Sequence, residues 1–373
     1  MGIRRGFFVA GSPIFGAPGN HLWDPPDRAR EAAYRWAGSG RRLVGGAGVS
    51  GAAWVVSGAP PPVLRYGFGM VMGDGIRAGL LGLRQAASER QLGLEGVYVT
   101  RDGEEPVSYR WVSDDRRDIY SVSKTFTSVA VGMAWAEGFL ELDDPVLAHL
   151  PEFKSTAAEG VEELTVRHLL SMTSGIELRW ENEDLDFEGD PAQAFLATPL
   201  AHPPGTNYAY RGLSSYVLGR IVAAASGSDL REFLMPRLFR PLGIGNPQWF
   251  RCPLGFPLGA MGLHLRTDEI ARLGETLLYD GSFRGEQLIP AEYVDLMHAD
   301  VTPTDRGHDP DNASYGLHCW PCARDDAWRM DGIYGQFSIM FPHQQATITV
   351  TAHYEHPTTD ILDAIWTELV PYL

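Results

Sequence analysis

Cysteine, positive charge and long apolar runs are all scarce in this sequence. Three cysteines among 373 residues are too few, and odd in number, for the disulfide framework of a small secreted domain. Lys and Arg total 31 against 47 for Asp and Glu, a formal charge of −16. This balance argues against nucleic acid and anionic membranes as partners, because both require a basic face. No apolar run reaches the roughly 18 residues that cross a bilayer, so we expect a soluble globular protein.

The N-terminal segment shows little regular patterning. Residues 1–82 are rich in Gly, Ala, Pro and Arg, and we expect a poorly defined leader there, followed by one folded domain over 83–373. Arg4 and Arg5 precede a short apolar patch that weakly resembles a twin-arginine export signal, although Pro13 interrupts the apolar segment. We therefore expect a cytoplasmic protein, with export by this signal as the alternative.

Patterns that would bind a metal or carry redox chemistry are incomplete. Cys319 and Cys322 form a C-x-x-C pair, but no second pair lies nearby to complete a zinc site. Residues 181–190 begin like an EF-hand loop, yet the twelfth position from Asp184 is Phe195, where such a loop needs Glu. The eleven histidines contain no H-x-x-x-H pair, and no G-x-S-x-G motif is present. We expect no metal and no cofactor, and interpret 181–190 as a solvated acidic loop.

The apolar pattern places strands near both ends of the domain and helices between them. Two β-rich runs flank Asp102-Gly103, a strong hairpin signal, and two more lie within 336–354. Helical patterns cover 118–138, 164–176, 191–198, 213–241, 266–281 and 358–373. This order predicts an α+β fold. An antiparallel sheet from about 94–112 and 328–354 would be flanked by helices, with a helical lobe inserted at about 118–260.

The helix predicted over 118–138 begins with an unusual turn. Ser121 and Lys124 are three positions apart and therefore face the same way. The unpaired N–H groups of a helix start favour negative charge on the serine oxygen and an uncharged lysine, and such a pair can act as nucleophile and base. Alternatively, Ser121 or Ser123 caps the helix and the lysine extends to solvent. The spacing alone leaves both interpretations open.

Further motifs accompany this turn along the chain. They are YSVSKTFTS, EGFLELDDPV, LTVRHLLSMTSGI, PPGTNYAYRGLSSYVLGRIV, GLHLRTDEIARLG, GEQLIPAEYV and DGIYGQFSIMFP. In their order and spacing, residues from about 93 to 373 resemble the serine β-lactamase-related hydrolases. That group includes class C-like β-lactamases, DD-peptidases, esterases and 6-aminohexanoate-dimer hydrolases. The resemblance implies a β-lactamase/transpeptidase-like fold for the domain over 83–373.

The resemblance also implies roles for individual side chains. Ser121 would attack a carbonyl carbon, and Lys124 would take its proton as the general base. Tyr210 matches the tyrosine of the family's Tyr-x-Asn motif and would assist as an acid or base. Tyr208, two residues earlier, is the rival for that position, but the register against the preceding Pro-Gly-Thr favours Tyr210.

A second motif would supply the oxyanion-binding groups. The backbone N–H of Gln336, directly after Tyr334 and Gly335, resembles the second donor beside the N–H of Ser121. Here, however, Ile333-Tyr334-Gly335 replaces the family's Lys-Thr-Gly or His-x-Gly. This loss of a cation and a hydroxyl weakens β-lactam recognition without touching the acylation machinery.

The substrate-binding groups depart from the family in other ways. Gly212 stands where Tyr-x-Asn has its asparagine, and Arg211 or Arg329 could supply a replacement cation. Nearby aromatic residues suit an apolar acyl or alkyl group; they are Trp180, Tyr208, Tyr334 and Trp249. We expect a serine hydrolase that cleaves a small-molecule ester or amide through an acyl-enzyme. The alternatives are a catalytically silent binding protein and a true β-lactamase or DD-peptidase.

Overall fold

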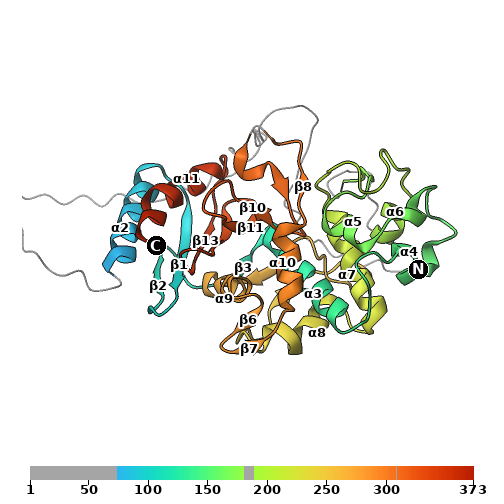
Figure 1. Ribbon diagram of the computed structural model, residues 1–373, viewed down its shortest axis with the longest axis horizontal. Coiled ribbons are helices and arrows are strands. Elements are labelled where there is room, and N and C mark those ends of the chain that lie inside the picture. Colours follow the sequence, from blue (N-terminus) through green and yellow to red (C-terminus); the bar gives the residue numbers. More distant parts are fainter. Residues whose placement is uncertain (1–73, 180–188, 308) are drawn as a thin grey trace, which may run out of the picture. The chain divides into compact units, whose positions relative to one another are not determined.

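A six-stranded sheet, built from both ends of the folded chain, forms the centre of the fold (Figure 1). The computed structural model describes residues 74–179, 189–307 and 309–373. The strands are, in sheet order, β10 (Trp320–Pro321), β11 (Trp328–Gly332), β12 (Gln336–Phe341), β13 (Ala346–Ala352), β1 (Leu94–Arg101) and β2 (Val107–Arg110). All neighbours are antiparallel. The predicted α+β fold and the two sources of its sheet are confirmed.

The N-terminal hairpin joins the C-terminal strands of the sheet through pairing between β1 and β13. Val97 pairs with Val350 and Val99 with Ile348, so β1 and β13 join segments from opposite ends of the sequence. The β1–β2 hairpin turns at Gly103, which has a φ of +73°, a conformation that glycine adopts without steric cost. This is the hairpin that Asp102-Gly103 predicts.

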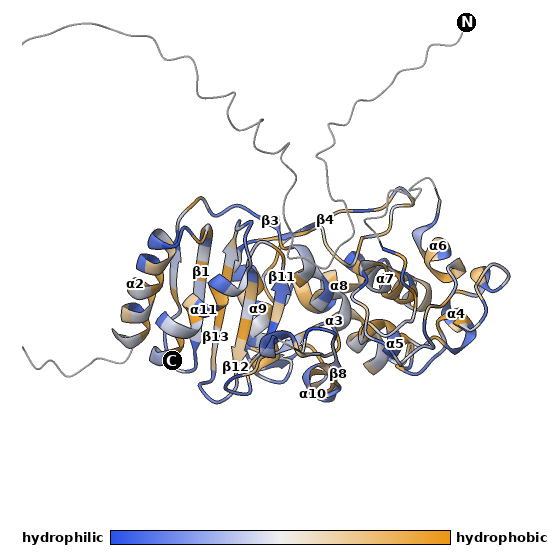
Figure 2. Ribbon diagram, turned by 90° about the horizontal axis from the view of Figure 1, so that it is seen from above, coloured by the Kyte–Doolittle hydropathy of each residue, from blue (hydrophilic) through white to orange (hydrophobic). Residues whose placement is uncertain are grey.

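Helices cover both faces of the sheet. Helices α2 (Asp74–Glu89) and α11 (Thr359–Glu368) lie on one face, where apolar side chains of β1, β12 and β13 form a shared core with Ile361 and Ile365. Helix α9 (Thr267–Leu278) covers the other, where Ser338 and Thr349 hydroxyls hydrogen-bond at 2.7 Å. With both faces covered, β12 and β13 are buried along their whole length. Figure 2 shows this apolar content as orange strands between the helices.

The predicted domain start at residue 83 falls inside helix α2. Residues 74–82 form the first half of that helix, so the leader predicted over 1–82 is too long at its C-terminal end. Gly79 and Gly82 lie so close to α11 and the following residues that a Cβ at either would stand 2.7 Å or less from Glu368. These two glycines therefore permit close packing of α2 against the C-terminal residues.

The inserted lobe is helical, as predicted, and lies beside the six-stranded sheet, on the right in Figure 1. Its elements are a 3₁₀ turn η1 (Tyr120–Val122), α3 (Ser123–Ala136), α4 (Val146–His149), α5 (Val166–Leu170), α6 (Pro191–Ala197), α7 (Gly212–Ser226), α8 (Leu230–Leu234) and a π-helical turn (Met235–Phe239). The helix predicted over 213–241 is interrupted. Gly227 has a φ of +74° and ends α7, and the Asp229 carboxylate then caps α8. The helix predicted over 164–176 ends at Leu170.

A small three-stranded sheet leads the chain into α3. It consists of β3 (Arg117–Asp118), β5 (Leu263–Leu265) and β4 (Gln248–Trp249), in that order. Smaller elements complete the described chain; they are β6 (Ser282–Phe283), β7 (Glu286–Gln287), α10 (Ala291–Ala299), β8 (Thr302–Pro303) and β9 (Ser314–Tyr315).

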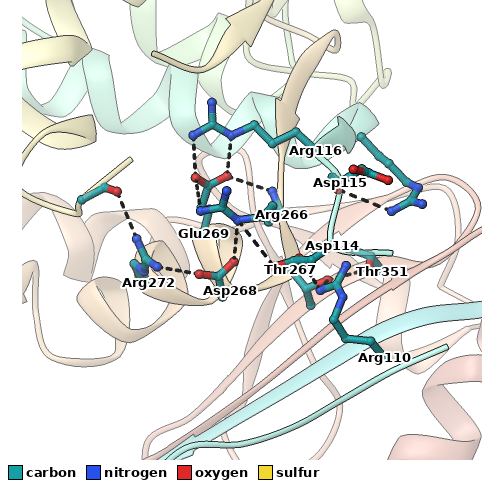
Figure 3. A network of polar contacts seen from close by, with 12 residues as sticks. Arg110, Asp114, Asp115, Arg116, Arg266, Thr267, Asp268, Glu269, Arg272 and Thr351 are labelled. Atoms are coloured by element: carbon teal, nitrogen blue, oxygen red, sulfur yellow. Dashed lines mark hydrogen bonds and ion pairs between the residues drawn. The ribbon is translucent and has the colours of Figure 1, made fainter. Parts of the chain in front are cut away.

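Strand β3 is held in place by a network of arginines and carboxylates (Figure 3). The fully buried carboxylate of Glu269, on α9, accepts two bonds from Arg116 at 2.6 and 2.9 Å. Arg266 approaches the same carboxylate at 3.0 Å. A bidentate arginine–carboxylate pair is geometrically specific, so this network fixes the strand that precedes Ser121 against α9.

Candidate active site

Ser121 and Lys124 face each other at the entry to α3. Ser121 lies in the 3₁₀ turn η1, one turn ahead of the α-helix, and its Oγ is 2.9 Å from Lys124 Nζ. Neither Ser121 nor Ser123 caps the helix with its side chain, and the Lys124 side chain does not extend to solvent, because the residue is 3% exposed. The capping interpretation is therefore wrong, and the paired arrangement is the one present.

Three groups surround the Lys124 amine. Besides Ser121 Oγ, these are the backbone carbonyl of Ala260, which accepts a bond of 3.0 Å, and the face of the Tyr210 ring, whose centroid is 4.8 Å from Nζ. The carbonyl is aimed by Gly259, which has a φ of +69° and whose own carbonyl accepts from Thr127 Oγ1 at 2.8 Å. Backbone geometry at Gly259 thus holds an acceptor against the amine.

The residue before Ser121 has a strained backbone. Tyr120 has a φ of +47°, an unfavourable conformation for a side chain of this size. Asp118 Oδ1 maintains it by accepting from the N–H of Tyr120 at 2.8 Å and from that of Gly262 at 3.0 Å. Burial raises the pKa of Asp118, and the same effect raises the pKa of Tyr120 to about 12. Strain of this kind occurs preferentially at functional sites.

The structure brings Tyr210, rather than Tyr208, to the lysine. Tyr210 lies in the loop before α7 and packs on Trp320 and Tyr315, at centroid distances of 6.1 and 5.8 Å. Tyr208 is 9% exposed, its ring packs on Tyr315 and Trp320, and burial raises its pKa well above the usual range. The geometry therefore supports the register that favours Tyr210.

The turn between β11 and β12 lies beside the Ser121 turn. Tyr334, with a φ of +65°, packs edge-to-face on Tyr120 at 5.1 Å. A Cβ at Gly335 would stand 2.4 Å from Ile361, which explains the glycine there. The side-chain amide of Gln336 donates to the backbone carbonyl of Ala352 at 2.5 Å. The side chain of Gln336 is thus directed into the sheet. Any hydrogen bond from Gln336 to a group at Ser121 would therefore come from its backbone N–H.

The beta-lactamase family model matches residues 41–370 of the sequence. This chain belongs to the beta-lactamase family. The match begins upstream of the residues that the structure describes and covers the whole of the Ser121 site.

Individual relatives of this beta-lactamase family member are distant. An uncharacterized protein of Alkalihalophilus pseudofirmus is 24% identical over 51% of this chain and 56% of its own length, so the chain spans about half of that relative. Among solved structures, EstCE1, described as a hydrolase with promiscuous acyltransferase activity, has a TM-score of 0.64 at 18% identity, covering 79% of this chain and 100% of its own. A D-stereospecific amidohydrolase from Streptomyces has a TM-score of 0.62 at 20% identity, covering 78% and 98%. At these identities the solved structures show the fold.

Three residues expected near a substrate are buried and bonded to other groups in this family member. Arg329 is fully buried, and its guanidinium bonds Asp331, Asn312 and a backbone carbonyl, so it does not replace the missing substrate cation. Trp249 is buried and donates from its indole N–H to a backbone carbonyl. Arg211 is also buried, and its Nη1 donates to the Tyr210 carbonyl at 3.1 Å. Trp180 lies outside the described residues.

The C-x-x-C pair and the acidic segment are the other patterns considered in the sequence. Cys319 and Cys322 are free thiols, and the Cys319 thiol, fully buried, donates to the Met297 carbonyl at 2.9 Å. In the described parts of the chain, no group of three or more His, Cys, Asp or Glu side chains is arranged to hold a metal. Most of the acidic segment 181–190 lies outside those parts. Every described helix is too short or too polar to cross a bilayer.

Sequence reasoning did not find Ala260, Asp118 or Tyr120. The contacts of these residues depend on tertiary structure, and a backbone carbonyl carries no residue-type signal. One available signal strengthens the assignment of Lys124. Lys124 and Lys154 are the two lysines among the 31 Lys and Arg residues of the chain. Because nearly all the other basic positions are arginine, a lysine three residues after a serine is an unusual choice.

Proposed function

We propose that this protein is a serine hydrolase that cleaves an ester or amide of a small molecule through an acyl-enzyme on Ser121. The observation that carries the proposal is the 2.9 Å contact between Ser121 Oγ and the amine of the buried Lys124. A nucleophile and base within hydrogen-bond reach are the signature of nucleophilic catalysis.

The surroundings of Lys124 suit a general base. An uncharged amine has two N–H groups and one lone pair. Donation of one N–H to the Ala260 carbonyl leaves the lone pair to accept the proton of Ser121 as Oγ attacks the substrate carbonyl. The ammonium that forms then lies against the face of the Tyr210 ring, a favourable cation–π position. Tyr210 supports the base in this way. We assign its hydroxyl the relay of this proton from the ammonium to the leaving group, which returns Lys124 to an uncharged amine.

The remaining steps complete the cycle. The tetrahedral oxyanion is bound by the backbone N–H groups of Ser121 and Gln336, and its collapse breaks the ester or amide bond and releases the protonated leaving group. Water, deprotonated by the amine of Lys124, then attacks the acyl-enzyme. The Lys124 ammonium returns the proton to Ser121 Oγ as the acid product leaves. The packing of the β11–β12 turn on the Ser121 turn supports the pairing of these two backbone donors.

The substrate class follows from what borders Ser121. Ile333 and Tyr334 carry no positive charge that could bind a substrate carboxylate, and the side chain of Arg329 is fully buried. Tyr120, Tyr334 and Tyr210 instead present aromatic surface near the serine, which favours a neutral substrate with an apolar group. EstCE1 is described as a hydrolase with promiscuous acyltransferase activity and the Streptomyces protein as an amidohydrolase, and both descriptions are compatible with acyl transfer from an ester or amide. A β-lactamase or DD-peptidase, which needs those lost anchors, is the second candidate.

Turnover of p-nitrophenyl acetate and butyrate tests the proposal. We expect the wild type to hydrolyse both, Ser121→Ala to retain less than a few per cent, and Lys124→Ala to be nearly as impaired, because nucleophile and base act as a unit. Lys154→Ala, which removes the exposed second lysine, is the matched control and should be fully active. A folded wild type without turnover would indicate the silent binding protein, and an active Ser121→Ala would indicate another nucleophile.

A further inference from the structure

His318 lies in the interior of the protein, behind the Ser121 site, in the segment that also carries the two neighbouring cysteines. The residue is 2% exposed. Its Nδ1 is 2.8 Å from the backbone carbonyl of Leu170, at the end of α5, and its Nε2 is 2.9 Å from Ser215 Oγ, on α7. A carbonyl only accepts, so Nδ1 carries the ring proton and Nε2 accepts from the Ser215 hydroxyl. Both ring nitrogens are thereby occupied by the protein.

The imidazole is a neutral group. Burial lowers the pKa of His318 to about 3, and the nearby charge of Lys124 contributes to this lowering. Tyr315 also packs near the ring, at a centroid distance of 6.2 Å, and burial raises its pKa. His318 therefore serves neither as a proton shuttle nor as a charge at neutral pH; it is a fixed hydrogen-bonding group.

His318 is connected to Lys124 from two sides. Its backbone carbonyl accepts from Thr125 Oγ1 at 2.8 Å, and Thr125 is the neighbour of Lys124 on α3. Its ring accepts from Ser215, whose own carbonyl packs so tightly on Gly259 that a Cβ there would stand 2.7 Å away. Gly259 in turn aims the Ala260 carbonyl that accepts from Lys124. Helix α3, which carries Lys124, and the loop that carries Ala260 are therefore both connected to His318.

The backbone at His318 supports a specific placement. Its φ is +64°, a left-handed conformation that few residues other than glycine adopt. The same segment continues to Trp320, which stacks on Tyr210. A residue strained in this way, with every polar group of its ring and its carbonyl paired, is held by the surrounding structure.

We propose that His318 is a positioning residue that holds the Lys124 amine between Ser121 and the Ala260 carbonyl. This inference rests on the proposed function, and it gives a role to the histidine that directly precedes the C-x-x-C pair. His318 acts through Thr125 and Ser215 and does not itself contact the reacting atoms.

The two lysines of the sequence allow the position of Lys124 to be observed directly. Full-length protein labelled with ¹³C-lysine should give two Cε signals, and Lys154→Arg identifies the one from Lys124. His318→Phe removes both ring bonds, His318→Gln keeps an oxygen that can accept from Ser215, and Thr125→Val removes only the bond to the His318 carbonyl. His298→Phe is the control, since that ring lies on α10, partly buried, and stacks on Trp328.

We expect the Lys124 signal to shift in all His318 and Thr125 variants and to stay unchanged in His298→Phe. Ester turnover should show kcat reduced roughly 10- to 100-fold in His318→Phe and about fivefold in Thr125→Val, with KM within twofold. His318→Gln should recover part of the loss. An unchanged Lys124 signal in folded His318→Gln and Thr125→Val would overturn the inference, as would losses of kcat no larger than that of the control. A wild type without turnover would instead refute the proposed function, and the lysine signals would still test the placement.

Discussion

The stability of this protein should depend on pH through His318. In the folded state the pKa of His318 is lowered from 6.5 to about 3 by burial and by Lys124, whereas in the unfolded chain it returns to its ordinary value. Between pH 6.5 and about pH 3, His318 is therefore protonated in the unfolded chain and neutral in the folded protein. The stabilisation is complete above pH 6.5 and is lost as the pH falls toward about 3.

The magnitude follows from the same two values. At pH 5, about 1.5 pH units below the ordinary pKa of histidine, the loss is about 2 kcal/mol, because each unit corresponds to about 1.36 kcal/mol. The full loss near pH 3 is about 5 kcal/mol. These are large fractions of the 5–15 kcal/mol that typically separates folded from unfolded domains.

The assay is urea unfolding of the wild type and His318→Gln at pH 7.5 and pH 5.0, followed by tryptophan fluorescence. His318→Gln should be less stable than the wild type at pH 7.5 but should lose about 2 kcal/mol less on acidification. Other buried groups, such as Asp118 and His298, titrate in both proteins and cancel in this comparison. His356→Gln, at an exposed position, is the control. Equal losses of stability in wild type and His318→Gln would refute the reasoning.

Three further predictions concern the site and its substrate. Tyr210→Phe should lower kcat by about 10²- to 10⁴-fold without unfolding the protein, whereas Tyr208→Phe should leave kcat within threefold; the reverse result would mean that the register of this motif is wrong. Replacing Cys319 and Cys322 by serine should leave ester hydrolysis within twofold, since burial raises the pKa of Cys322 to about 11 and that of Cys319 further; loss of activity together with loss of a bound metal would contradict this. Aryl esters should have a higher kcat/KM than nitrocefin on the same preparation, and a clear excess for nitrocefin would show that other groups replace the missing anchors.

The sheet and the central pair could be predicted because their signals are local. Asp102-Gly103 defines a hairpin within a few residues, and the spacing of Ser121 and Lys124 is a property of one turn. The ends of helices were predicted less well. The leader predicted over 1–82 includes the first half of α2, where Gly79 and Gly82 allow two helices to approach closely, and Gly227 ends a helix that the apolar pattern continues.

The groups that position the lysine could not be predicted from local patterns. The Ala260 carbonyl acts through its backbone, so its residue type carries no information about its contact with Lys124. His318 contacts Thr125 and Ser215 across long stretches of sequence, and its proximity arises only when α3, α5 and α7 pack together. In the sequence His318 directly precedes the C-x-x-C pair, whose thiols are the evident chemical groups, whereas the structure connects the histidine to the Ser121 site.

Covalent labelling by a fluorophosphonate, read by mass spectrometry, tests the central claim most directly. The account predicts one adduct per wild-type chain, located on Ser121, absent from Ser121→Ala and formed much more slowly in Lys124→Ala than in Lys154→Ala. A folded wild type that forms no adduct, or an adduct on another residue that persists in Ser121→Ala, would contradict the assignment of Ser121 as the nucleophile and Lys124 as its base.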